Sequence, residues 1–109
     1  MEQLFAEGKK LSIPPFRVLW LKNSGGENLK FGVGVSVRNF KKAVDRNRIK
    51  RLIKESWRLQ KNGLKELANN KQVELSVFIN FTGKEVPKFT EVKTSVGKII
   101  EELKKIISV

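Results

Sequence analysis

Lysine and arginine are the residue types in this chain best placed to do chemistry, and they gather in one segment. Residues 38–61 hold ten of them against only Asp45 and Glu55, so this stretch contributes +8 of the formal net charge of +12. Concentrated positive charge is suited to holding a polyanion and is typical of a nucleic-acid-binding surface. The segment therefore predicts phosphate contacts.

The residue types that most often perform catalysis are missing. The 109 residues include no histidine and no cysteine. This excludes the usual general base at neutral pH, the Ser-His and Cys-His nucleophile pairs, and thiolate metal sites. The eleven acidic residues are scattered, whereas metal-assisted hydrolysis needs clustered carboxylates. We therefore expect no catalytic residue and no metal site on the protein.

Length and composition indicate one domain spanning residues 1–109, because 39% hydrophobic content is sufficient for one modest core. The absence of cysteine fits a reducing compartment. No run of about 18 apolar residues could span a membrane, and no apolar stretch follows a basic start as in a signal peptide. We expect a cytoplasmic protein without membrane contact.

The cationic segment has the spacing of an amphipathic helix between Asn39 and Asn62. One side collects Ile49, Leu52, Ile53, Ser56, Trp57 and Gln60. The opposite side, flanked by Arg46 and Arg48, collects Asn47, Lys50, Arg51, Lys54, Arg58 and Lys61. Stacked like charges destabilise an isolated helix by about 0.2–0.5 kcal/mol per pair, which indicates an anionic partner. If six to eight cations each neutralise a phosphate, log K should fall against log salt with a slope of roughly −4 to −7.

The remaining pattern predicts the scaffold that positions this helix. Alternating apolar residues predict strands over 16–22, 29–37 and 73–81, and at best an edge strand over 11–13 before two prolines. The turn-rich residues 23–28 predict a hairpin between the strands on either side of them. A short opening helix over 2–7 and a final helix over 90–107, which should cover the sheet, complete the pattern.

Two features of the strands indicate close contacts on one sheet face. Gly32 and Gly34 alternate on one side of their strand, which predicts close approach by a packed helix or by a ligand, with packing favoured. Phe78 is aromatic on an otherwise polar strand face. It could stack on an unpaired nucleic-acid base.

The central segment also resembles a known family. The run Ala43-Val44-Asp45-Arg46-Asn47-Arg48-Ile49-Lys50-Arg51-Leu52-Ile53-Lys54-Glu55, followed by Trp57-Arg58, resembles the signature of the bacterial ribonuclease P protein subunit. Phe31-Gly32-Val33 leading into Lys41-Lys42 supports the match. The resemblance implies an α+β, two-layer αβββαβα sandwich of the ribosomal protein S5 domain 2-like type. Its βαβ crossover would be left-handed, an exception to the usual right-handed rule.

The resemblance also implies a function. Proteins of this family are the small partner of a large catalytic RNA, and together they hydrolyse the 5′ leader from precursor tRNA with magnesium ions. The implied contacts to the ribonuclease P RNA are Arg46, Asn47, Arg48, Lys50 and Arg51, extended by Arg38, Lys42, Lys54 and Arg58. The leader would lie between the first helix and one sheet face, against Phe5 and Phe16. The protein alone would be a monomer without a bound cofactor.

The chain departs from the family pattern at two places. Family members carry a longer basic segment before the position of Phe5, and they often have a Ser-Val-Ser-Lys-Lys run where this chain reads Gly34-Val35-Ser36-Val37-Arg38.

Three functions compete, and we rank a ribonuclease P subunit first. A ribosomal or RNA-assembly protein that binds structured RNA without a role in cleavage comes second, and a self-sufficient nuclease third.

Overall fold

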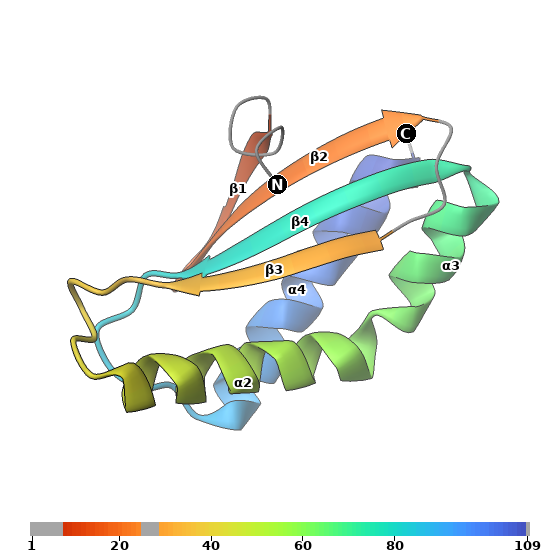
Figure 1. Cartoon of the computed structure of the whole chain (residues 1–109). Coiled ribbons are helices and arrows are strands. Elements are labelled where there is room, and N and C mark those ends of the chain that lie inside the picture. Colours follow the sequence, from red (N-terminus) through yellow and green to blue (C-terminus); the bar gives the residue numbers. More distant parts are fainter. Residues whose placement is uncertain (1–7, 25–28, 109) are drawn as a thin grey trace.

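The computed structural model describes residues 8–24 and 29–108. In chain order, its elements are β1 (Lys9–Ile13), β2 (Phe16–Ser24), β3 (Leu29–Val35), α2 (Ala43–Gln60), α3 (Asn62–Asn70), β4 (Val73–Phe81) and α4 (Phe89–Ser108). The strands form one sheet, and the helices pack on one of its faces (Figure 1). This is the α+β, two-layer arrangement that the family resemblance implies. The expected opening helix over residues 2–7 lies outside the described residues.

The strand order is β1-β2-β4-β3, so β4 lies between β2 and β3. β2 is antiparallel to both β1 and β4, whereas β3 is parallel to β4. The predicted hairpin between β2 and β3 is therefore wrong, although the predicted edge position of β1 is confirmed. The physical reason is the burial of β4, in which every second residue from Val73 to Phe81 is buried. This apolar strand takes the central position, where β2 and β3 cover its two edges, so β2 and β3 cannot pair with each other.

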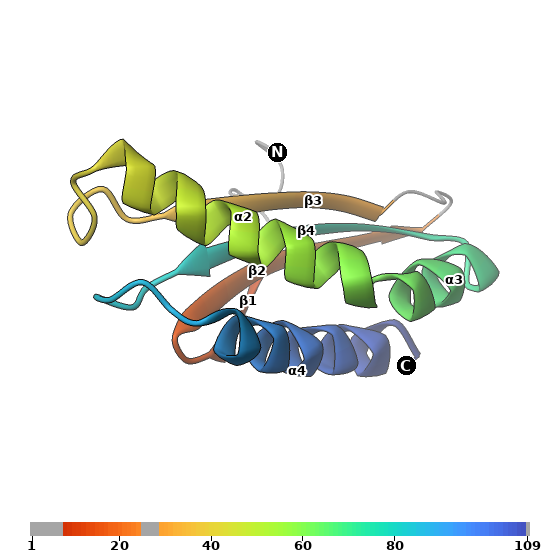
Figure 2. The ribbon, with the colours of Figure 1, turned by 90° about the horizontal axis from the view of Figure 1, so that it is seen from below.

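The chain passes from β3 to β4 through α2 and α3. In Figure 2, seen from the helix side, β3 and β4 both run from right to left and β4 lies below β3. A crossover in front of the sheet with this order is left-handed, as the family resemblance implies and contrary to the common rule. The sequence reading did not include α3, which buries only Leu64 and Ala68 and carries the chain back to the start of β4.

The core fills the space between the sheet and the helices. α2 contributes Ile49, Ile53 and Trp57, and the Trp57 ring stacks on Phe31 of β3 with ring centroids 4.3 Å apart. The final helix α4 buries one whole side, comprising Val92, Val96, Ile99, Ile100, Leu103 and Ile107. Because the apolar side of α2 is fixed against β3 and α4, its opposite side must face outward.

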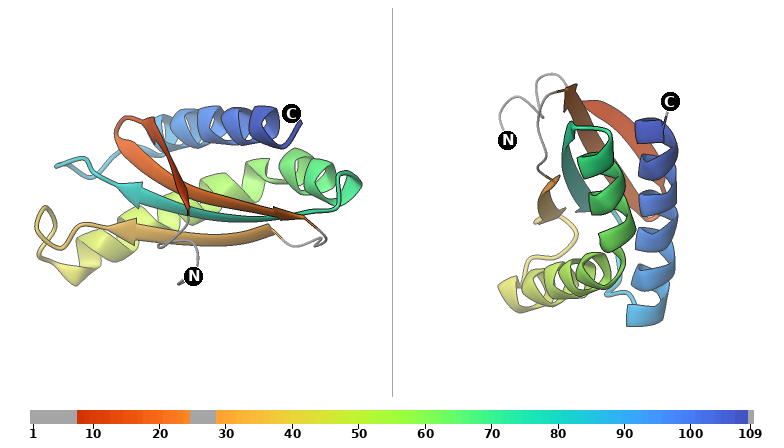
Figure 3. Two further views of the ribbon diagram at one scale, coloured as in Figure 1. Left: turned by 90° about the horizontal axis from the view of Figure 1, so that it is seen from above. Right: turned by 90° about the vertical axis from the view of Figure 1, so that its right-hand side faces the viewer.

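Figure 3 shows that α2, α3 and α4 all lie on the same side of the sheet. The other side, here called the open face, is covered by none of the described helices. The molecule therefore presents two distinct surfaces: the outer side of α2 and the open face.

Candidate nucleic-acid interface

The outer side of α2 carries the predicted cations on one continuous surface. We call it the α2 strip and define it as Asn47, Arg48, Lys50, Arg51, Lys54 and Arg58. Five of these residues, with Glu55, line a shallow depression of about 440 Å³, and Arg48 lies beside it on the same helix. All but the half-buried Lys50 are exposed. The sequence prediction that these side chains face away from the core is confirmed.

One cation of the α2 strip is paired with an acid. Arg58 donates from Nε to Oε2 of Glu55 over 3.2 Å, and its Nη2 contacts Oε1 of the same carboxylate. The hydrogen bond from Arg58 lowers the pKa of Glu55 from its ordinary value. Within residues 8–24 and 29–108, no other member of the strip forms an ion pair. The strip therefore keeps three exposed cations, Arg48, Arg51 and Lys54, that such pairing does not neutralise.

Arg46 has a structural role that the sequence reading did not assign. Its Nη1 donates to the carbonyl oxygens of Phe40 and Lys41, over 2.7 and 2.8 Å. These carbonyls belong to residues 36–42, the segment between β3 and α2, which we call the lead-in. Arg46 thus holds the lead-in to the first turn of α2. Arg38 and Lys42, the other two predicted cations, lie exposed on the lead-in.

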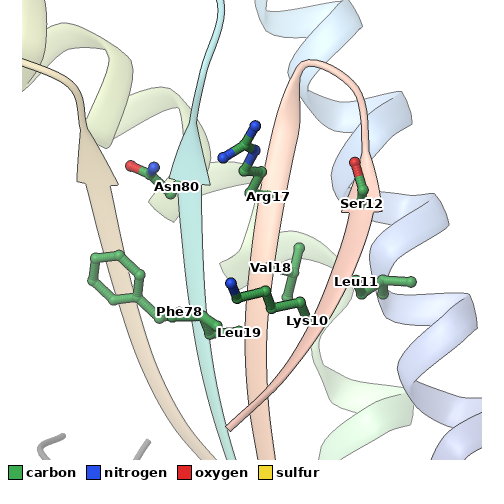
Figure 4. Close-up of a pocket in the computed structure, with 8 residues that line it drawn as sticks. All are labelled: Lys10, Leu11, Ser12, Arg17, Val18, Leu19, Phe78 and Asn80. Carbon is green, nitrogen blue, oxygen red and sulfur yellow. The ribbon is translucent and has the colours of Figure 1, made fainter. Parts of the chain in front are cut away.

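A second candidate surface is a pocket of about 650 Å³ on the open face. It is lined by Lys10, Leu11, Ser12, Arg17, Val18, Leu19, Phe78 and Asn80 (Figure 4). Lys10, Arg17 and Phe78 come from three neighbouring strands, β1, β2 and β4. An aromatic ring flanked by cations is the combination that binds single-stranded nucleic acid, by base stacking and phosphate neutralisation. We call this the open-face pocket.

A glycine lets the Phe78 ring lie flat over the neighbouring strand. A Cβ atom added at Gly34 of β3 would stand 2.7 Å from Cζ of Phe78, closer than real Cβ contacts. The predicted close approach at these strand glycines is therefore confirmed at Gly34 as packing. The group that approaches is a side chain of the adjacent strand β4, and not a helix.

The expected contact of Phe16 with a leader is wrong. Phe16 is 1% exposed and packs against Phe81, with ring centroids 5.4 Å apart, on the helix side of the sheet. Because side chains alternate along a strand, its neighbours Arg17 and Leu19 are the ones that reach the open face. Among the described residues that line the open-face pocket, the aromatic side chain is Phe78. Phe5 lies outside the described residues.

Neither a metal centre nor a membrane segment is found in the part of the chain that the structure describes. Across residues 8–24 and 29–108, no three acidic side chains gather in a group that could hold a metal ion. None of the described helices is long and apolar enough to cross a bilayer.

The chain matches known proteins along most of its length. The family model described as ribonuclease P matches residues 1–104. The ribonuclease P protein component of Porphyromonas gingivalis is 32% identical over 97 residues, which cover 87% of this chain and 71% of that protein.

Solved structures share the fold. The RNase P protein of Staphylococcus aureus aligns with a TM-score of 0.72 at 18% identity, covering 97% of this chain and 89% of the other. The RNase P protein of Thermotoga maritima, solved in complex with 1-(4-fluorophenyl)-2-thiourea, aligns with a TM-score of 0.66 at 26% identity, covering 92% and 90%. With its signature helix, its left-handed crossover and these matches, the chain belongs to the ribonuclease P protein family, the protein component of the endoribonuclease that matures the 5′ ends of tRNA.

Proposed function

We propose that the α2 strip binds the catalytic RNA of ribonuclease P and that the open-face pocket binds the single-stranded 5′ leader of precursor tRNA. The observation that supports this most directly is the placement of the two surfaces. The strip lies in the helix layer and the pocket lies on the other side of the sheet. One small domain can therefore contact two RNA segments at the same time.

The composition of the α2 strip suits a structured RNA. Arg48 and Arg51 present planar guanidinium groups that can make two parallel hydrogen bonds to a phosphate, and Lys54 adds a compact charge. Each phosphate neutralised should add about −0.7 to −0.9 to the slope of log K against log salt. We expect binding to the catalytic RNA to weaken steeply as salt is raised.

The open-face pocket suits a flexible single strand. Phe78 contributes an aromatic ring, Lys10 and Arg17 contribute charge for the backbone, and Ser12 and Asn80 contribute hydrogen-bonding groups. Stacking of a base on an aromatic ring tolerates any sequence, because every base has a π-face. A pocket of this kind would accept leaders of differing sequence.

The chemistry of cleavage belongs, in this proposal, to the RNA. The described residues offer no carboxylate cluster that would fit magnesium ions, so we derive no catalytic step on the protein. The protein would instead raise the affinity for precursor tRNA and support assembly. We place this activity in the cytoplasm, where bacterial precursor tRNA is made.

The test is a reconstitution with the ribonuclease P RNA of Porphyromonas gingivalis and a precursor tRNA at modest magnesium. Two precursors are compared, one with a long leader and one with the leader truncated next to the cleavage site. Arg48→Ala should weaken assembly and reduce the salt slope by about 0.7–0.9. Arg17→Ala should leave assembly intact and weaken only the long-leader precursor. The matched control is Lys98→Ala, which removes an exposed cation from α4.

Each surface can fail separately in this test. Equal weakening of both precursors by Arg17→Ala would show that the leader does not bind in the open-face pocket. An unchanged salt slope for Arg48→Ala would show that the catalytic RNA does not bind the α2 strip. If leader release does not depend on the protein at modest magnesium, the proposed function as a whole falls.

A further inference from the structure

Two large apolar side chains stand exposed near the start of α2. Val44, in its first turn, is 75% exposed and Val37, on the lead-in, is 63% exposed. The only other exposed large hydrophobic residue that the structure describes is Leu59, near the far end of α2, at 48%. Single exposed apolar residues are ordinary on protein surfaces. Two of them fall within residues 37–44, where the lead-in enters α2, and this local feature calls for an explanation.

The lead-in that carries Val37 is held firmly in place. The Phe40 ring is buried and packs on Phe81 with centroids 5.9 Å apart, which inserts the lead-in into the core. Asn39 donates from Nδ2 to the carbonyl oxygens of Thr82 and Gly83 over 3.4 and 3.3 Å. Together with the two hydrogen bonds from Arg46, these contacts fix the backbone of the lead-in against the rest of the domain. The valines are therefore presented outward by an anchored backbone.

Helix geometry places Val44 on the α2 strip. At about 100° per residue, Val44 projects between Arg51 and Arg48, the two exposed arginines of the strip. Leu59 projects within about 20° of Arg48 but lies eleven residues, about 16 Å, farther along the helix axis. Val37 is followed by Arg38, and Lys41 and Lys42 are exposed on the same lead-in. Val44 thus lies among the cations of the strip, and Val37 lies on a lead-in that carries three more.

We propose that Val37 and Val44 contact unstacked bases of the catalytic RNA that binds the α2 strip. This inference rests on the proposed function of the strip. Regular A-form RNA offers mainly phosphates and sugar hydroxyls, whereas loops and bulges expose base faces that apolar side chains can cover. A contact of this kind would select an irregular RNA region. It would also persist at high salt, because burying apolar surface releases no counterions.

The experiment measures the affinity of the protein for the ribonuclease P RNA of Porphyromonas gingivalis over a series of salt concentrations. Val37→Thr and Val44→Thr, made together, keep the side-chain shape and charge but replace a methyl by a hydroxyl at each site. We expect binding about 5- to 10-fold weaker at every salt, which is about 1–1.4 kcal/mol at 1.4 kcal/mol per tenfold. The line of log K against log salt should move down and stay parallel to that of the parent.

Three further variants make the result decisive. Leu59→Gln is the control for losing an exposed apolar side chain at the other end of α2, far from the lead-in, and its line should overlay that of the parent. Val44→Leu keeps the apolar surface in a good helix former and should bind like the parent. Arg48→Ala tests the strip itself, and it should change the slope. Thermal melting of each variant checks the fold.

Three results would overturn the inference. Parent-like binding of the double threonine variant, with a lowered slope for Arg48→Ala, would leave the strip standing and remove the valine contact. A changed slope in the double threonine variant would show that it disturbs phosphate contacts, again against an apolar contact. If Arg48→Ala leaves the slope unchanged, the proposed function of the strip fails, and the inference falls with it.

Discussion

Arg46 and Arg48 stand two residues apart in the same signature, yet the structure predicts different consequences of losing each one. Arg46→Ala removes two hydrogen bonds from a charged donor to the carbonyls of Phe40 and Lys41. Buried bonds to charged groups contribute roughly 1.5–3 kcal/mol each, but water can replace the donor at these partly exposed carbonyls. We therefore expect a total loss of only about 1 kcal/mol, which is what one ordinary hydrogen bond contributes net of its exchange with water. For a domain near 100 residues this lowers Tm by roughly 4–8 °C.

Arg48→Ala is the matched variant, because Arg48 is exposed and none of the hydrogen bonds described for this chain involves its guanidinium. Surface changes of this kind usually stay within about 0.5 kcal/mol, so its melting temperature should remain close to that of the parent. Thermal unfolding followed by circular dichroism, without RNA, compares the two variants directly. Equal melting temperatures for Arg46→Ala and Arg48→Ala would refute the anchoring role of Arg46.

Three further predictions follow from single contacts. Glu55→Gln should release Arg58 for phosphate and steepen the salt dependence of RNA binding, measured by titration. Because the folded protein lowers the pKa of Glu55, any stability from this pair is present above the ordinary value of 4.5 and is lost as the pH falls through the lowered one. The melting difference between parent and Glu55→Gln should therefore close in acid, and a constant difference would contradict this. Gly34→Ala should displace the Phe78 ring, cost about 1–3 kcal/mol by overpacking, and weaken binding of a long-leader precursor. Equal binding would show that the ring position is not needed. Phe16→Ala should cost about 3–5 kcal/mol in denaturant unfolding, as for a buried ring, and a loss near zero would restore Phe16 as a surface residue.

Sequence periodicity was a sound guide to α2 because the helix repeats one local rule over five turns. The burial of Ile49, Ile53 and Trp57 could be derived from spacing alone, and with it the outward direction of the α2 strip. Strand positions were likewise within a few residues of the structure. Both are local properties, set by side-chain alternation within one segment.

Pairing between distant segments could not be derived in this way. The turn-rich residues between β2 and β3 reverse the chain, but nothing local states that β4 will come between the two strands. Side-chain alternation already places Phe16 and Arg17 on opposite faces of the sheet. The strand pattern alone could therefore have assigned the leader site to the face that carries Arg17. The role of Arg46 had no signal in the sequence, because its partners are backbone carbonyls that every residue possesses.

The position of β4 has a consequence for how the protein is made. β2 and β3 meet only through β4, which follows α2 and α3 along the chain. While the ribosome is still synthesising α3, the cationic helix α2 is already complete but the sheet that should support it still lacks its central strand. Folding is therefore a late, cooperative event that depends on long-range contacts. A nascent chain halted before residue 73 would contain the cationic helix but not the central strand of the sheet.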